Sequence, residues 1–335
     1  MIDLKSIKPN KVSTNYNKHS MYLMGVAKSG KTTTMFDILG QDALFIELED
    51  GAEAIPGIKA IRCYNFADVK EVVWQLQDMV EAGECPFKSV VFDTTDMLEV
   101  FISKSVCSQA GVNEIGEIPH GKGYAQIDKV LLNLINDIKQ LGLGVHFIGH
   151  TKLKKITDKI NNIEYEKYIP STSERFQKLI LADCYFMSFI YTKIDPETRA
   201  EQRVMCFRDT VQFLAGSRFR FMPAMIPLGA EHFKKAVEMA IAKEEEVRAG
   251  STTTEVKVEN KTQLDFKAIM ARGAELGGKL QAAGKAMELT TVIERCLGLD
   301  EAGKPKRFNE LKESQVETAH ILVMELEKLA KSCGL

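Results

Sequence analysis

The sequence predicts an α/β protein whose core is a mostly parallel central sheet, followed by a small α-helical C-terminal module. Apolar strand-like runs alternate with stretches of helical spacing, which is typical of a parallel sheet with helices on both faces. Near residue 245 the composition changes to a charged segment with few large apolar residues, which predicts a linker. We therefore expect a lead at 1–20, a core at 21–243, a linker at 244–261 and a helical module at 262–335.

Composition and charge narrow the function classes. The 335 residues are 45% hydrophobic and 27% charged, and a formal net charge of −2 gives no bulk sign of a nucleic-acid binder. The seven cysteines form no CxxC pair, which argues against a disulfide framework or a zinc site. No run approaches the ~18 consecutive apolar residues of a membrane span. We expect no membrane partner and a cytoplasmic protein, in the host cytoplasm for a phage-encoded chain.

The strongest motif is GVAKSGKT at residues 25–32, between an apolar run and a stretch of helical spacing. It fits the P-loop pattern G-x-x-x-x-G-K-[ST], in which bare backbone N–H groups and a helix N-terminus hold a polyphosphate. Lys31 would reach the terminal phosphates and Thr32 would ligate Mg²⁺, so ATP and Mg²⁺ are the expected cofactors. The alternative is a chance glycine-rich turn. The candidate nucleotide-binding residues are Gly25, Val26, Ala27, Lys28, Ser29, Gly30, Lys31, Thr32 and Thr33.

Carboxylates follow two of the predicted strands. The run SVVFD ends in Asp93, where a Mg²⁺-organising aspartate would lie beside the P-loop; the alternative is that Asp93 caps the next helix. The strand after the P-loop helix ends among Glu47, Glu49 and Asp50. Carboxyl ends of parallel strands face the ligand, so a glutamate there could orient or deprotonate a water. A later strand ends in His150, which could sense the γ-phosphate.

Taken in order, FIELEDGAE, SVVFDTTDML and VHFIGHTKLKK resemble the RecA-like recombinase core. The resemblance implies that Glu49 is catalytic, that Asp93 holds Mg²⁺ and that His150 is a switch residue, a position where the family usually has Gln. The chain is also similar to compact RecA-core ATPases of phages, including the Sak-type single-strand annealing group. That similarity includes an Ala-Asp pair on a late strand, 182–183, and the ending FLAGSRFRF. It covers roughly residues 18–230.

The resemblance implies single-stranded DNA as a partner, bound by two segments at 114–126 and 152–175. Lysines would meet phosphates and an aromatic side chain could stack on a base. Acids in the second segment leave open a plain solvated hairpin, although no acid interrupts its first three lysines. The candidate DNA-binding residues are Lys122, Tyr124, Lys152, Lys154 and Lys155.

A homo-oligomer, as a ring or filament, is the expected assembly. An arginine of one subunit could then stabilise the γ-phosphate of its neighbour, and the candidates are Arg208 and Arg218; exposed strand faces are the alternative use. In the C-terminal module, Lys304, Lys306 and Arg307 could touch nucleic acid or a partner protein. An apolar stripe there predicts the module's own core: Ile321, Leu322, Met324, Leu326 and Leu329.

Together these features predict an ATP-hydrolysing, RecA-like protein that acts on single-stranded DNA in phage recombination, annealing or replication. A different class remains open, in which the chain is a nucleotide-switched interaction protein that recruits a partner through its helical tail. A ring motor or helicase shares the same core and is the third alternative.

Overall fold

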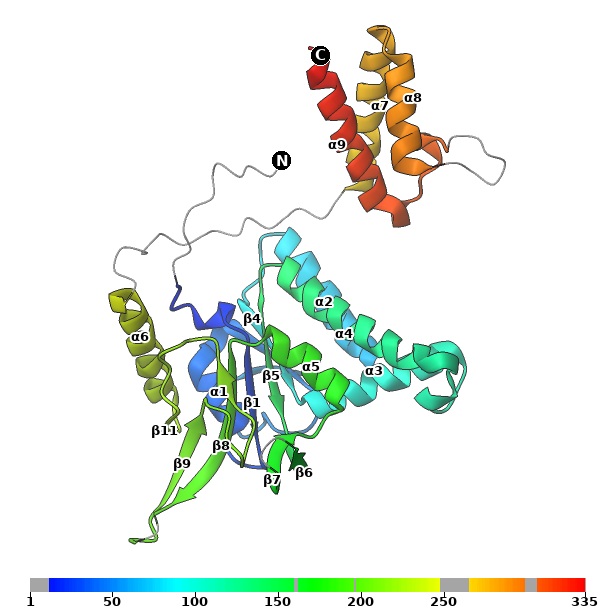
Figure 1. Cartoon of the computed structure of the whole chain (residues 1–335). Helices are drawn as coiled ribbons and strands as arrows, with labels where there is room; N and C mark the ends of the chain where they lie inside the picture. The colour runs from blue at the N-terminus through cyan, green and yellow to red at the C-terminus, as the bar shows by residue number, and fades with distance from the viewer. Residues whose placement is uncertain (1–11, 160–161, 196, 248–264, 299–305, 335) are drawn as a thin grey trace. The chain divides into compact units, whose positions relative to one another are not determined.

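A computed structural model describes residues 12–159, 162–195, 197–247, 265–298 and 306–334. The chain divides into two compact units, Met1–Val258 and Glu259–Leu335, which we describe separately (Figure 1). Helix α6 runs to Val247, so the linker predicted from residue 244 begins too early. Residues 248–261 of that linker lie outside the described residues, as do 1–11 of the lead. No helix in the described part of the chain is long and apolar enough to cross a membrane.

The first unit is built on a nine-stranded, mostly parallel sheet, as the sequence predicts. The strand order is β11-β9-β8-β1-β5-β4-β2-β3, and β10 pairs with β8. The parallel strands are β1 (Met21–Gly25), β2 (Ala43–Glu47), β3 (Lys59–Arg62), β4 (Ser89–Asp93), β5 (Gly144–Gly149) and β8 (Phe186–Ile194). The antiparallel strands are β9 (Glu201–Cys206), β10 (Gly216–Ser217) and β11 (Met225–Pro227).

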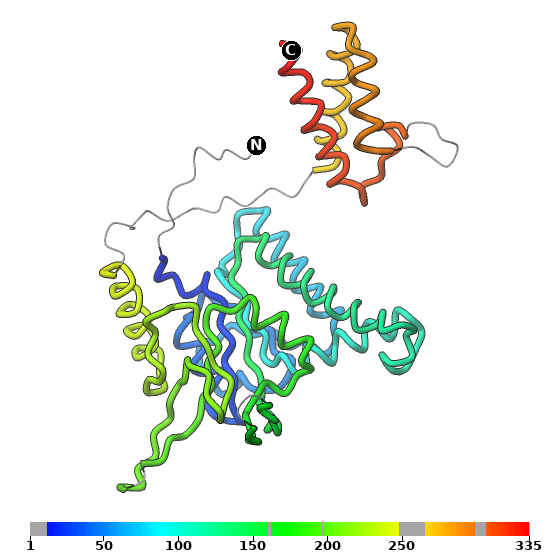
Figure 2. The backbone as a smooth tube through the Cα atoms, viewed as in Figure 1, coloured from blue at the N-terminus to red at the C-terminus, as the bar shows by residue number. Residues whose placement is uncertain are grey.

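Helices cover both faces of this sheet (Figures 1 and 2). Tyr22 and Met24 of β1 pack in the core beneath α2 (Phe66–Glu81), α3 (Thr95–Ala110), α4 (Lys122–Gln140) and α5 (Glu174–Asp183). Met21 and Leu23 pack in the opposite core, beneath α1 (Lys31–Leu39) and α6 (Ala230–Val247). Successive strand side chains point to opposite faces, so a strand buried on both sides reads as the continuous apolar run seen in the sequence.

The described end of the N-terminal lead closes the edge of the sheet where β4 and β5 begin. The Asn17 side chain, in the short helix η2 (Tyr16–Lys18), accepts a hydrogen bond from Ser89 at 2.8 Å. A Cβ atom on Gly144 would lie 1.6 Å from the Asn17 carbonyl oxygen, so only glycine fits there. His146 on β5 is fully buried; its Nδ1 accepts from the Met21 N–H at 3.3 Å, and its Nε2 lies 3.3 Å from the Asn17 carbonyl.

Two hairpins extend from the parallel part of the fold. β6 (Thr151–Asp158) and β7 (Ile163–Pro170) form a separate antiparallel pair directly after β5, as the sequence predicts. β8 and β9 form the second hairpin (Figure 1). The Ala182-Asp183 pair, predicted on a late strand, instead forms the end of helix α5, together with the apolar residues 179–181 before it. Ser173 begins that helix by accepting a hydrogen bond from the Phe176 N–H.

The second unit consists of α7 (Phe266–Ala282), α8 (Ala286–Leu297) and α9 (Val316–Ser332). Its core contains Leu276, Leu280, Leu289, Leu322 and Leu326, with Leu329 partly buried. Three of the five residues of the predicted stripe therefore belong to the core, whereas Ile321 and Met324 are 57% and 45% exposed. Lys304 lies outside the described residues. The remaining short helices are η3 (Gly40–Asp42), η4 (Ile115–Glu117), η5 (Pro119–Gly121), η6 (Phe308–Glu310) and η7 (Glu313–Gln315).

Candidate functional site: a P-loop with acids on the adjoining strands

The loop at 26–30 joins β1 to α1, as the motif requires. Gly25 is needed for packing, because a Cβ atom there would lie 2.6 Å from the Ile190 carbonyl oxygen of β8. Gly30 has φ +93°, a left-handed conformation that side chains disfavour. Val26, Ala27 and Lys28 are exposed, whereas the Ser29 hydroxyl is buried with no hydrogen-bond partner in the described chain. The loop therefore has an open outer surface and a polar atom left unsatisfied.

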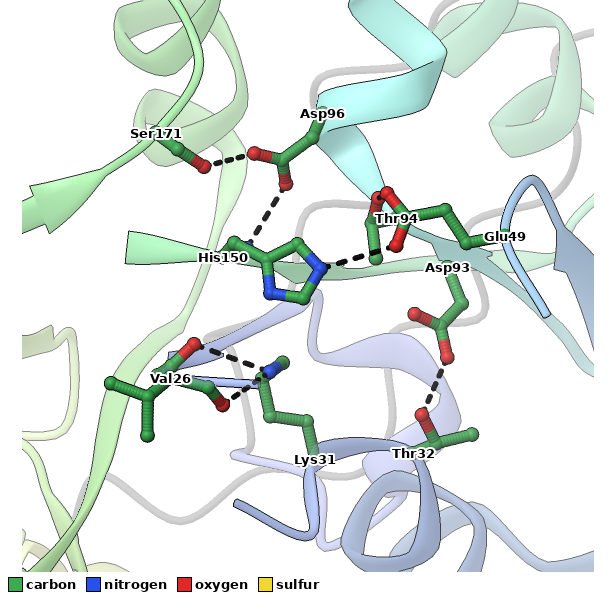
Figure 3. Close-up of polar contacts among 10 residues, drawn as sticks. Val26, Lys31, Thr32, Glu49, Asp93, Thr94, Asp96, His150 and Ser171 are labelled. Carbon is green, nitrogen blue, oxygen red and sulfur yellow. Dashed lines mark hydrogen bonds and ion pairs between the residues drawn. The ribbon is translucent and has the colours of Figure 1, made fainter. Parts of the chain in front are cut away.

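Lys31 lies folded over the loop that precedes it. Its Nζ donates to the carbonyl oxygens of Gly25 at 3.2 Å and Val26 at 2.9 Å (Figure 3). Burial lowers the pKa of Lys31, and the carboxylates of Asp93, Asp96 and Glu49 act in the opposite direction. The ammonium group thus lies within the loop, held by carbonyl oxygens and under the electrostatic influence of three carboxylates.

Asp93 ends β4 directly beside the start of α1. Its Oδ2 accepts a hydrogen bond of 2.6 Å from the Thr32 hydroxyl (Figure 3). Burial raises the pKa of Asp93, and the contacts with Thr32 and Lys31 oppose that rise. The N-terminal cap of α3 is Thr94, so Asp93 does not fill the capping role considered above. A hydroxyl and a carboxylate oxygen at this spacing are the hard oxygen ligands that Mg²⁺ prefers, so the pair fits a P-loop metal.

Three acids lie at the end of β2 or just after it, namely Glu47, Glu49 and Asp50, and of these Glu49 faces this site. Its Oε1 accepts from the Thr94 hydroxyl at 2.7 Å, and its Oε2 lies 3.2 Å from His150 Nε2 (Figure 3). Glu47 is buried and accepts from the Ala52 N–H, which shapes the turn after the strand. Asp50 pairs instead with Arg62 at 3.3 Å. Both carboxylate oxygens of Glu49 are therefore held by side chains from the next two strands of the sheet.

Asp96 and Ser171 complete the site, and sequence reasoning missed both as functional residues. Asp96 Oδ2 accepts from the His150 N–H at 3.0 Å, and Oδ1 accepts from the Ser171 hydroxyl (Figure 3). The Ser171 N–H in turn donates to the His150 carbonyl at 3.0 Å. Ser171 directly follows β7, so this network joins the acids of the site to the base of the β6–β7 hairpin. The only sequence signal was Asp96 in the first turn of α3, which is read as a cap.

All three lysines at the start of the hairpin have partners within their own chain, and two of these partners are acids. Lys154 forms an ion pair with Glu174, and Lys155 forms one with Glu164. Lys152 donates to the carbonyl oxygens of Ser171 and Thr172 at 2.9 and 3.1 Å. Although no acid interrupts the run from Lys152 to Lys155, the fold thus brings Glu164 and Glu174 beside it.

The first predicted DNA segment is not an open loop. It contains η4 and η5, and Lys122 and Tyr124 lie in the first turn of helix α4. This α3–α4 connection lies well away from the β6–β7 hairpin (Figure 1). The first segment therefore lies apart from the hairpin itself, although Arg175 at the end of the second segment forms an ion pair with Asp128 of α4.

The candidate trans-acting arginines are held against their own chain. Arg208 donates to the carbonyl oxygens of Arg220 at 2.7 Å and Met222 at 3.3 Å. Arg218 donates to the Ala182 carbonyl and lies over the Tyr185 ring at 4.9 Å. A role in a neighbouring subunit would require these contacts to break, and that role stays a prediction.

Comparisons with known proteins agree with this geometry. A family model described as an AAA domain matches residues 17–219, which include the P-loop, Asp93 and His150. The SPbeta prophage-derived uncharacterized protein YorG of Bacillus subtilis (strain 168) is 23% identical over 325 residues, covering 95% of this chain and 93% of that protein. A solved KaiC-like protein from Pyrococcus horikoshii OT3 is 12% identical in sequence, and the match covers 60% of this chain and 89% of the KaiC-like chain. Its TM-score of 0.33 is too low to equate the two folds. The core is an α/β P-loop domain built on a mostly parallel sheet. The family match spans more than half of the sequence, so this chain belongs to the AAA domain family.

Proposed function

We propose that the core binds ATP with Mg²⁺ and hydrolyses it. The observation that carries this proposal is the convergence of Thr32, Asp93 and Glu49 on Lys31, from three neighbouring elements of the fold. Phosphoryl transfer asks mostly for positioning and for charges that stabilise the transferring group. A buried lysine, a metal-binding pair and a glutamate within one site meet that requirement.

Each residue has a distinct task in this proposal. Bound Mg²⁺ would neutralise phosphate charge and would be held by Thr32 and Asp93. Lys31 would leave the carbonyl oxygens of its loop and donate to the terminal phosphates. Glu49 would orient the attacking water or accept its proton. Since Thr94 and His150 occupy both Glu49 oxygens, one of these contacts would be replaced by the water before hydrolysis.

We further propose that the nucleotide state changes how the protein holds single-stranded DNA, in phage recombination, annealing or replication. The support is the network from Glu49 through His150 and Asp96 to Ser171 at the base of the β6–β7 hairpin. The similarity to a prophage-derived protein fits the phage setting. A homo-oligomer with nucleotide between neighbours is part of the same proposal, with Arg208 or Arg218 released to act in trans.

A second function is favoured by a specific observation. The hairpin lysines are already paired, which leaves them less available for phosphates. The C-terminal unit exposes Ile321 and Met324 three residues apart on α9, and they lie on one side of that helix. This arrangement would suit a nucleotide-switched protein that recruits a partner protein through its helical module.

Hydrolysis of ATP by matched variants tests the first proposal. Glu49→Gln keeps the size of the side chain but removes the base, and we expect turnover to fall by about 10²- to 10⁴-fold. Asp50→Asn is the control, because the neighbouring carboxylate points to Arg62 instead, and its turnover should stay within about twofold of wild type. Lys31→Ala should abolish turnover. Equal rates for the Glu49 and Asp50 variants would contradict the catalytic assignment.

DNA binding separates the two functions. For a DNA-acting ATPase, single-stranded DNA should bind in the presence of ATP, weaken steeply with salt and raise the hydrolysis rate. Oligomer size is measured in the same samples by light scattering. A protein that hydrolyses ATP but binds no single strand at low salt, with or without nucleotide, would favour the partner-recruiting function.

A further inference from the structure

Arg203 lies beside the P-loop although it is two strands away from β1 in the sheet. It is on β9, opposite Thr192 of β8, and its carbonyl accepts a hydrogen bond from the Leu228 N–H at 2.9 Å. Its NH1 is 3.8 Å from the position that a Cβ atom on Gly30 would occupy, and the Leu228 side chain is 3.6 Å from the same point. The guanidinium therefore lies against the last residue of the loop, immediately before Lys31.

The Arg203 guanidinium has no hydrogen bond or ion pair with any other residue that the structure describes. Its side chain is exposed, whereas the guanidinium groups of Arg208 and Arg218 are held by carbonyl oxygens of their own chain. A guanidinium group carries five donors and a permanent charge, and it binds phosphate in a bidentate manner. Arg203 is thus a cation without a partner in the described chain. It lies next to a loop whose backbone N–H groups can also bind an anion.

We propose that Arg203 binds a phosphate group of the nucleotide held by the P-loop of its own chain. This inference rests on the proposed nucleotide binding and adds a residue to that same site. Gly30 and Lys31 begin helix α1, where the N-terminal partial positive charge and the free N–H groups hold phosphates common to ADP and ATP. Arg203 therefore contributes to the affinity for both nucleotides and is a binding residue in cis, in contrast to the trans role considered for Arg208 and Arg218.

The strand carries Arg203 there for a geometric reason. β8 is parallel to β1 and is paired with it up to Gly25↔Ile190, and it then continues to Ile194 past the start of the P-loop. β9 returns along β8 (Figure 1). Because Arg203 is paired with Thr192, two residues beyond the Gly25↔Ile190 pair, it lies at the end of the sheet where the P-loop begins. Lys193 follows Thr192, the residue of β8 that is paired with Arg203. Because strand side chains alternate, Lys193 points to the face of the hairpin opposite to that of Arg203.

Direct binding of fluorescent ADP, with unlabelled ATP and inorganic tripolyphosphate as competitors, tests the proposal. Arg203→Ala should weaken all three by a similar factor, about 10- to 100-fold, which is the loss expected for one charge-assisted hydrogen-bonded contact. Arg203→Lys should recover part of that loss, because it restores the charge without the planar fork. Lys193→Ala removes an equal charge from the same hairpin and should bind all three like wild type. Thermal unfolding of each variant checks that the fold is intact.

The outcomes are distinguishable. If wild type binds no nucleotide, the proposed function fails together with this inference. If wild type binds, Lys31→Ala does not, and Arg203→Ala binds as wild type does, the inference alone is overturned. A loss of ADP and ATP affinity with unchanged tripolyphosphate affinity would also overturn it, since the contact would then be with the nucleoside.

Discussion

Acidification should destabilise the core through His146, and the size of the effect follows from its surroundings. The ring is fully buried, and its Nδ1 accepts a hydrogen bond from the Met21 N–H. Nε2 therefore carries the proton and donates to Asn17. A second proton would place an N–H of the ring against the N–H of Met21. Burial lowers the pKa of His146 from 6.5 to about 3.

The sign follows from linkage. The unfolded chain takes up a proton near pH 6.5, whereas the folded chain does so only near pH 3, so stability is fully present above pH 6.5 and falls as the pH drops between these values. At pH 5 the distance below the ordinary value is about 1.5 pH units, and at about 1.4 kcal/mol per unit the loss from His146 is about 2 kcal/mol. Burial also lowers the pKa of His19, which adds to the loss in the same direction.

Urea unfolding at pH 7 and pH 5 measures this loss. The chain has one tryptophan, Trp74 on α2, so its fluorescence follows the first unit alone. We expect the free energy of unfolding to drop between the two pH values by about 2 kcal/mol more in wild type than in His146→Gln. The variant starts lower at pH 7, because its amide fits the ring site less well, but it has no imidazole to protonate. Equal pH dependence in the two proteins would refute the reasoning.

Three further perturbations follow from the same structure. Gly144→Ala puts a methyl group on the Asn17 carbonyl and should lower the free energy of unfolding by about 3 kcal/mol, at the upper end of overpacking costs, in the same urea assay. Ser171→Ala removes the bond from the hairpin base to the site and should reduce stimulation by single-stranded DNA while basal ATP hydrolysis persists; unchanged stimulation would rule out this route. Glu174→Gln releases Lys154 and should tighten single-stranded DNA binding, steepening its salt dependence by about 0.7 in log–log slope; an unchanged slope would show that Lys154 meets no phosphate.

The sequence was informative where the signal is local. The P-loop residues, the apolar strands and the acids that follow them are fixed by short-range patterns, so Lys31, Asp93 and Glu49 were found as one set. The order of the strands then brings them together, because β5 lies between β1 and β4 and carries His150 into the gap. The same local rule fails for 179–184, since a short apolar run fits a buried helix as well as a strand.

Contacts between distant residues could not be read from the sequence. No acid interrupts the sequence from Lys152 to Lys155, yet Glu174 reaches Lys154 from α5. Arg208 and Arg218 look available, yet their partners are backbone carbonyls, which leave no mark in a sequence. Nothing local in the sequence sets Arg203 apart from them, and only the return of β9 along β8 places it at Gly30. Basic residues can therefore be listed from sequence, but whether each one is satisfied depends on the fold.

His150 contacts both the proposed catalytic glutamate and the base of the β6–β7 hairpin. Its ring contacts Glu49, the proposed base, and its backbone N–H and carbonyl contact Asp96 and Ser171 at the hairpin. If water or phosphate replaces the ring contact, we expect the strand end that carries both backbone contacts to adjust with it, because they belong to the same residue. Coupling between hydrolysis and the hairpin then needs only a small shift at the end of β5, with no movement of the sheet.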